Sequence, residues 1–70
     1  MSDDVVTELA TFAFPFNKNV ALKNVAQDTG VNWLRITIRE GRRFTIMDLD
    51  PYSAAEFGAH LTAWAQEKQD

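Results

Sequence analysis

Apolar and polar side chains alternate along four stretches of the chain. In residues 34–39 (LRITIR) every second side chain is apolar, and residues 43–46 (RFTI) repeat the pattern. Residues 19–27 alternate in the same way, and residues 5–14 place Phe12 and Phe14 on one side of an extended segment. A period of two, rich in β-branched and aromatic residues, is typical of strands with one buried face. The pattern therefore predicts four strands.

Glycines between these stretches predict how the strands pair. A three-residue loop at residues 28–30 ends in Gly30 and sets Leu22 opposite Ile36. We expect an equivalent loop at residues 39–41, with Gly41 in the left-handed conformation that such turns require. This second loop sets Ile36 opposite Phe44 and Leu34 opposite Ile46, which keeps every apolar row on one face. The register of the first strand is left open.

The C-terminal third of the chain carries the signals of a helix. Asp50 followed by Pro51 is typical of an N-cap and first helical residue, although Ser53 with Glu56 forms a competing capping box. An apolar stripe follows at helical spacing and is expected to pack on the sheet: Ala54, Phe57, Leu61, Trp64 and Ala65. Gly58 is expected to allow close approach of the helix to the sheet.

These elements together predict one α+β domain over residues 1–70, a four-stranded antiparallel β-meander with one C-terminal helix on one face (ββββα). The face under the helix is expected to hold Phe12, Phe14, Val20, Leu22, Leu34, Ile36, Ile38, Phe44 and Ile46. Replacing a central residue such as Ile36 with alanine would cost about 2–5 kcal/mol.

The opposite face of the predicted sheet carries an apolar row beside a basic one. The expected registers place Val25, Trp33 and Met47 side by side as a partner surface, because an exposed tryptophan patch usually marks a contact surface. The neighbouring cations Lys23, Arg35 and Arg43 would contact phosphates if this face bound single-stranded nucleic acid, with Trp33 stacking on a base.

Length and composition favour self-association. Seventy residues without cysteine lie near the lower limit for a stable core, and neither disulfides nor thiolate-bound metals can reinforce the fold. Small domains often gain buried area by forming dimers. No signal peptide or membrane span is evident, so a cytoplasmic protein, of bacterial origin, is expected. The net charge of −3 conceals a basic centre between Lys18 and Arg43, with acidic ends on either side.

Candidate catalytic residues all have simpler explanations. The triplet at residues 28–30, Asp-Thr-Gly, matches that of aspartic proteases but fits a hairpin turn. Asp48 and Asp50 form a possible metal pair, yet both charges also suit the N-terminus of a helix. His60 stands one turn after Glu56 and reads as an ordinary surface residue. We therefore expect no enzyme activity, no metal and no cofactor.

Two resemblances accompany these patterns. Four strands followed by one helix, with a basic sheet, resemble the single-stranded-DNA-binding transcriptional coactivators, and this resemblance implies dimers and nucleic-acid binding. The segment RFTIMDLDP, residues 43–51, is similar to one in short uncharacterised bacterial proteins of unknown function. That likeness implies no activity. The expected function is a non-catalytic interaction module that forms a homodimer or binds a protein partner, and the alternative is weak nucleic-acid binding.

Overall fold

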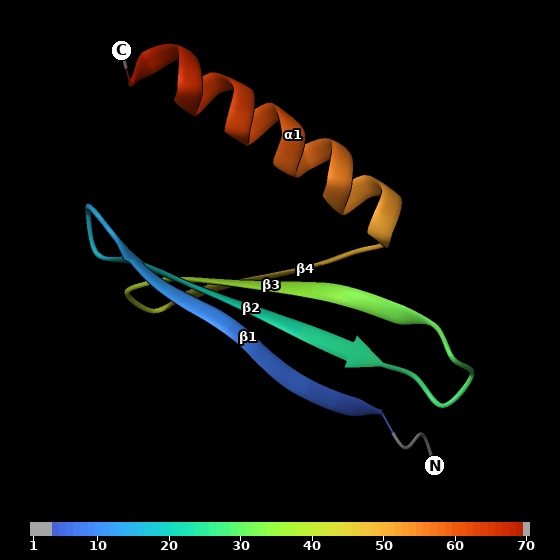
Figure 1. Cartoon of the computed structure of the whole chain (residues 1–70). Coiled ribbons are helices and arrows are strands. Elements are labelled where there is room, and N and C mark those ends of the chain that lie inside the picture. The colour runs from blue at the N-terminus through green and yellow to red at the C-terminus, as the bar shows by residue number, and fades with distance from the viewer. Residues whose placement is uncertain (1–3, 70) are drawn as a thin grey trace.

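Four antiparallel strands precede a single helix in the computed structural model, which describes residues 4–69. The elements are β1 (Val5–Phe14), β2 (Lys18–Ala26), β3 (Asn32–Glu40), β4 (Arg43–Leu49) and α1 (Pro51–Lys68). The strands form one sheet in the order β1-β2-β3-β4, and α1 lies over one face of it (Figure 1). This arrangement confirms the predicted ββββα fold.

The β2–β3 register agrees with the prediction. Leu22 lies opposite Ile36, and the backbone N–H of Gln27 donates to the carbonyl of Val31 at 2.8 Å, which closes the three-residue loop. Gly30 has φ of +93°, a conformation that favours glycine. The glycine therefore fixes both the loop length and the face on which the β2 and β3 side chains lie.

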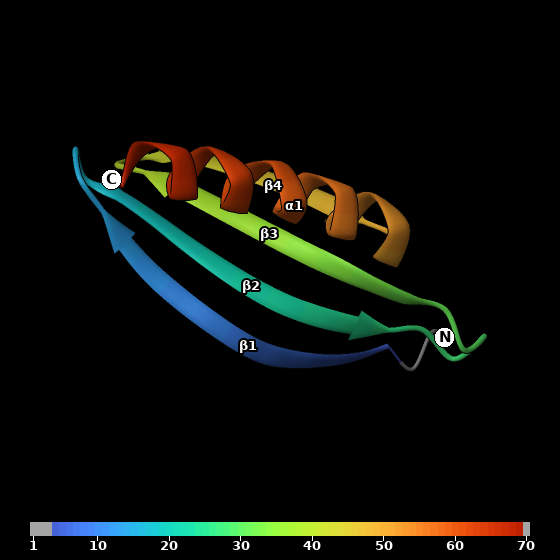
Figure 2. The ribbon, with the colours of Figure 1, turned by 45° about the horizontal axis from the view of Figure 1, so that its top comes forward.

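The first strand also faces as predicted. Phe12 lies opposite Val20 and Phe14 opposite Lys18, so both rings are on the same face as Leu22. A β-bulge between Glu8 and Ala10 shifts the register of β1 towards its N-terminal end. The bulge bends the strand and adds to the curvature of the sheet that Figure 2 shows.

The predicted β3–β4 register is wrong. The turn contains two residues, with Gly41 first at φ of +59°, and Ile36 lies opposite Met47 rather than Phe44. Glycine at the first of two central positions is typical of a type II′ hairpin. The register is shifted from the expected one by an odd number of residues, so the two faces of β4 are exchanged. Met47 and Leu49 consequently face the helix, whereas Phe44 and Ile46 lie on the opposite face.

The helix begins where the sequence predicts. The Asp50 carboxylate accepts hydrogen bonds from the backbone N–H groups of Tyr52 and Ser53 at 3.1 and 3.3 Å, and Pro51 is the first helical residue. The expected close approach at Gly58 is absent, because a Cβ built there meets nothing within 4 Å. The helix therefore lies farther from the sheet than the glycine suggested.

The described part of the chain has a very small core. Among residues 4–69, Val25 and Ile36 are the buried hydrophobic residues, at 2% and 8% exposure. A compact monomer of 7.9 kDa would expose about 4,400 Å², whereas this chain exposes 5,874 Å². Its radius of gyration is 14.1 Å, against about 11 Å for a compact chain of this length. The single chain leaves much of its apolar surface in contact with solvent.

Candidate functional site

An apolar groove separates the helix from part of the sheet. The α1 backbone comes close to β3 and β4 and, in the part of the chain described, to no other strand. Figure 2 shows the same arrangement, with β1 and β2 left beside the helix rather than under it. The space between them has a volume of about 480 Å³. Its lining consists of apolar residues from both layers: Phe12, Phe14, Val20, Leu22, Leu34, Ile36, Ile38, Leu49, Ala54, Phe57, Gly58 and Leu61.

Aromatic side chains on both sides of the groove remain exposed. Phe12 and Phe14 stack with ring centroids 5.6 Å apart and keep 43% and 49% of their surface accessible. On the helix, Phe57, Leu61 and Trp64 are 48%, 56% and 65% exposed. The large side chains of the predicted stripe are therefore not buried against the chain's own sheet, although Phe57 and Leu61 do line the groove. The small residues Ala54, Gly58 and Ala65 are the less exposed positions of the helix.

The partner surface predicted around Trp33 does not form as expected. Val25 does lie opposite Trp33, but Val25 is already buried within the chain. Met47 pairs with Ile36 and therefore lies on the helix face, not beside Trp33. The error follows from the β4 register. Trp33 itself lies on the face away from the helix and is half-buried.

Charges on the face away from the helix form a row across the sheet. Glu8 lies opposite Lys23, Lys23 opposite Arg35, and Arg35 opposite Asp48. The Arg35 guanidinium donates from Nε and a terminal nitrogen to the two carboxylate oxygens of Asp48, at 2.9 and 3.2 Å. The hydrogen bond from Arg35 lowers the pKa of Asp48, and the same bond raises the pKa of Arg35. The row therefore balances two cations with two carboxylates.

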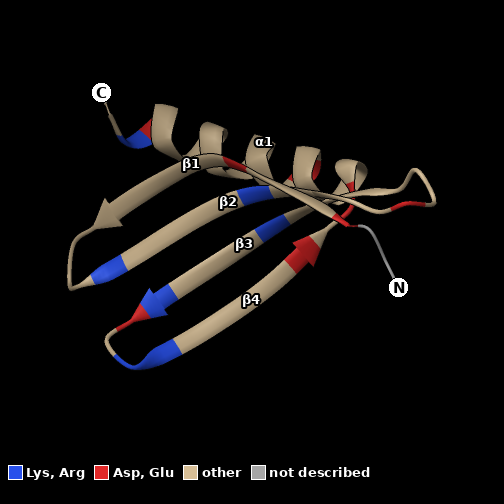
Figure 3. Cartoon of the chain, turned by 90° about the horizontal axis from the view of Figure 1, so that it is seen from below, with Lys and Arg blue, Asp and Glu red and all other residues tan. Residues whose placement is uncertain are grey.

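The three predicted phosphate contacts do not share a surface. Arg35 is engaged by Asp48, and Arg43 lies opposite Glu40 on the helix face, again because of the β4 register. Lys23 keeps the expected position opposite Arg35, with Glu8 on its other side. In the view from below, β2, β3 and β4 all carry basic segments, and acidic ones lie at the ends of β3 and β4 (Figure 3). The predicted set therefore keeps Lys23 and Arg35 side by side, whereas Arg43 lies on the other face of the sheet.

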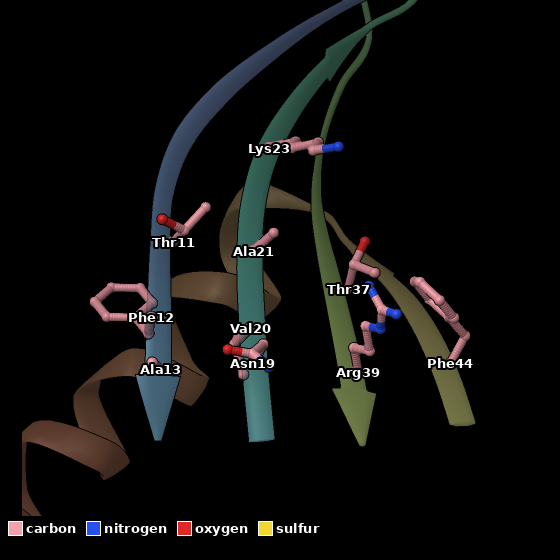
Figure 4. A pocket seen from close by; sticks show the side chains of 10 residues that line it. All are labelled: Thr11, Phe12, Ala13, Asn19, Val20, Ala21, Lys23, Thr37, Arg39 and Phe44. Carbon is pink, nitrogen blue, oxygen red and sulfur yellow. The ribbon is translucent and has the colours of Figure 1, made fainter. Parts of the chain in front are cut away.

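A shallow cleft lies beyond the charged row, on the same face. Figure 4 shows its floor of small side chains, including Ala21 and Thr37, with Lys23 at one end. At the other end the Arg39 guanidinium lies 5.6 Å from the centroid of the Phe44 ring. The cleft has a volume of about 530 Å³ and is open to solvent along the sheet. Sequence reasoning missed Phe44 here because it assigned that ring to the opposite face.

The three aspartates considered as catalytic or metal-binding candidates all occupy structural positions. Asp28 lies in the β2–β3 turn, Asp48 binds Arg35, and Asp50 caps α1. Hydrogen bonding from the Ser53 side chain, and then from backbone N–H groups, lowers the pKa of Asp50. Across residues 4–69, no three His, Cys, Asp or Glu side chains gather where they could hold a metal ion. Within that same range, no helix is both long and apolar enough to cross a membrane.

The sequence contained one signal that would have revealed the register of β4. Phe44 and Ile46 share one face of this strand and Met47 and Leu49 share the other, so β4 has an apolar pair on each face whichever register it adopts. Leu49 immediately precedes the helix cap and must lie on the helix side for α1 to pack there. That constraint selects the observed register and places Phe44 on the other face.

The fold and the groove define the class of this molecule: a small ββββα protein whose single helix covers half of one sheet face. The chain belongs to a family described as "Family of unknown function (DUF6967)", which it matches over residues 3–67. This confirms the resemblance to a family of unknown function. No curated protein and no solved structure matches the chain, and the resemblance to single-stranded-DNA-binding coactivators gains no support.

Proposed function

We propose that this chain is a non-catalytic interaction module that acts as a homodimer, and that the groove between α1 and the sheet is its dimerisation surface. The observation that carries the proposal is the excess of exposed surface. The chain exposes about 1,500 Å² more than a compact monomer of its mass. A standard protein interface needs about 800 Å² from each partner. The excess is therefore sufficient for a stable dimer.

The composition of that surface also supports self-association. The groove lining is apolar, with the exposed rings of Phe12 and Phe14 on the sheet side and that of Phe57 on the helix side. A contiguous exposed apolar surface rimmed by polar residues usually marks a contact surface. A twofold dimer uses the same patch on both subunits, so one apolar surface suffices. This placement replaces the Trp33 surface expected from the sequence.

Sedimentation velocity over a concentration series tests the proposal. The wild-type chain should sediment as a dimer at micromolar concentration, with a monomer emerging on dilution. Leu61→Glu places a charge in the groove and should shift the chain to the monomer, whereas Thr62→Glu, one residue further along the exposed helix surface, should not. A wild-type chain that remains monomeric at all concentrations would refute the proposal.

A further inference from the structure

The uncovered half of the sheet face has the width of one helix. Strands in a sheet lie about 4.8 Å apart, so β1 and β2 together present a strip roughly 10 Å wide. A helix with its side chains is about 10–12 Å in diameter. The chain's own α1 already occupies the neighbouring strip over β3 and β4. One further helix would complete the layer.

That strip offers an apolar bed for a helix. Phe12 and Val20 lie opposite each other, as do Ala10 and Leu22, all on the helix face of the sheet. The Phe12 and Phe14 rings are stacked with an interplanar angle of 8°, which places an aromatic pair near the end of the strip. The groove lining includes no charged side chain. An amphipathic helix would therefore be the best-matched occupant.

The matching helix surface is present on α1 itself. Phe57, Leu61 and Trp64 follow one another at spacings of four and three residues, which places them on one side of the helix. All three remain about half exposed or more in the single chain. The polar side chains Glu56 and Glu67 lie at the flank of this stripe, where they can stay in solvent. A second copy thus carries the surface that the first lacks.

We infer that α1 of a second copy lies over β1 and β2 of the first, and that the arrangement is reciprocal. This inference rests on the proposed homodimer and specifies its geometry. The stripe of Phe57, Leu61 and Trp64 from each helix contacts the Phe12–Phe14 stack of the other copy. A twofold axis makes the two contacts identical, so both exposed patches of each chain are covered by one operation. Pairing through the β1 edge is disfavoured by the bulge between Glu8 and Ala10.

Disulfide trapping tests the reciprocal contact, because the chain contains no cysteine. Phe14→Cys and Trp64→Cys variants, mixed in equal amounts and oxidised, should yield a mixed disulfide dimer severalfold in excess of either homodimer. Thr11→Cys is the control, since Thr11 lies on the same strand but on the opposite face of the sheet. Its mixture with Trp64→Cys should give no excess of the mixed disulfide.

Tryptophan fluorescence provides a second readout that leaves the groove intact. The chain has two tryptophans, and Trp33→Phe leaves Trp64 as the sole emitter. Its emission should shift to shorter wavelength as the dimer forms, since Trp64 is 65% exposed in the single chain. A dimer that shows neither the Phe14–Trp64 disulfide nor this shift would overturn the inference while leaving the homodimer in place. The absence of any dimer would overturn both.

Discussion

The stability of the chain should depend on its concentration. Val25 and Ile36 are the buried hydrophobic residues of the described chain, so in the proposed dimer most of the stabilising burial would come from the interface. Two chains of 70 residues unfolding together absorb about 100 kcal/mol, at about 0.7 kcal/mol per residue. For a dimer that dissociates as it unfolds, each tenfold dilution then lowers Tm by about 5 °C. Dilution from about 100 μM to about 1 μM should lower Tm by about 10 °C.

Thermal denaturation followed by circular dichroism measures this shift directly, and a pair of variants links it to the groove. Trp64→Ala should cost about 3–5 kcal/mol if the ring is buried between copies. In an isolated chain, with the ring 65% exposed, the cost should be within about 0.5 kcal/mol. Tyr52→Ala is the matched aromatic control on the same helix, at 87% exposure. A Tm that is independent of concentration, together with equal effects of the two variants, would refute the reasoning.

Three further predictions concern the single chain. Ile36→Ala should lower the free energy of unfolding, measured by urea denaturation, by about 2–5 kcal/mol. Ile46→Ala, at 60% exposure, should change it by about 0.5 kcal/mol or less. Equal costs for the two variants would favour the β3–β4 register expected from sequence. Gly58→Ala should raise the free energy of unfolding by up to about 1 kcal/mol, because alanine favours the helix and no atom lies within 4 Å of the added methyl group. A loss of stability in the same assay would mean that another helix approaches there. Asp50 has a lowered pKa in the folded chain, so its contribution is present above the unfolded value of about 4 and is lost as pH falls through the folded value. Asp50→Asn keeps a capping acceptor but removes this titration, and its stability difference from wild type should disappear in acid; a difference that persists unchanged at low pH would contradict the assignment.

Local sequence signals predicted the features that depend on local chemistry. The Asp50–Pro51 cap fixed the start of α1, and Gly30 fixed the β2–β3 loop. The β3–β4 register was not predictable in the same way, because β4 carries apolar residues on both faces and its alternation selects neither. Turn geometry at Gly41, the ion pair between Arg35 and Asp48, and the position of Leu49 before the helix decide it. These are relations between strands, which a periodicity within one strand does not contain.

The prediction that the helix stripe would be buried failed for a different reason from the β3–β4 register. Hydrophobic spacing correctly identified which side of α1 is apolar, and the inference that this side packs on the chain's own sheet assumed that a single chain completes its own core. In the structure Trp64 is mostly exposed and the small residues of α1 lie nearer the sheet. An amphipathic pattern shows that a surface needs a partner, but it carries no information on which molecule supplies that partner.

The balance between strands and helices explains why the partner should be another copy. A four-stranded sheet is wide enough for two helices on one face, and each chain supplies one. A partner that covered β1 and β2 with a polar surface would leave the Phe12–Phe14 stack against polar groups, at a cost in desolvation. An unrelated apolar helix would cover the strip but leave Trp64 of α1 exposed. A reciprocal contact between two identical chains covers both surfaces at once, because the α1 stripe of each copy covers the β1–β2 strip of the other.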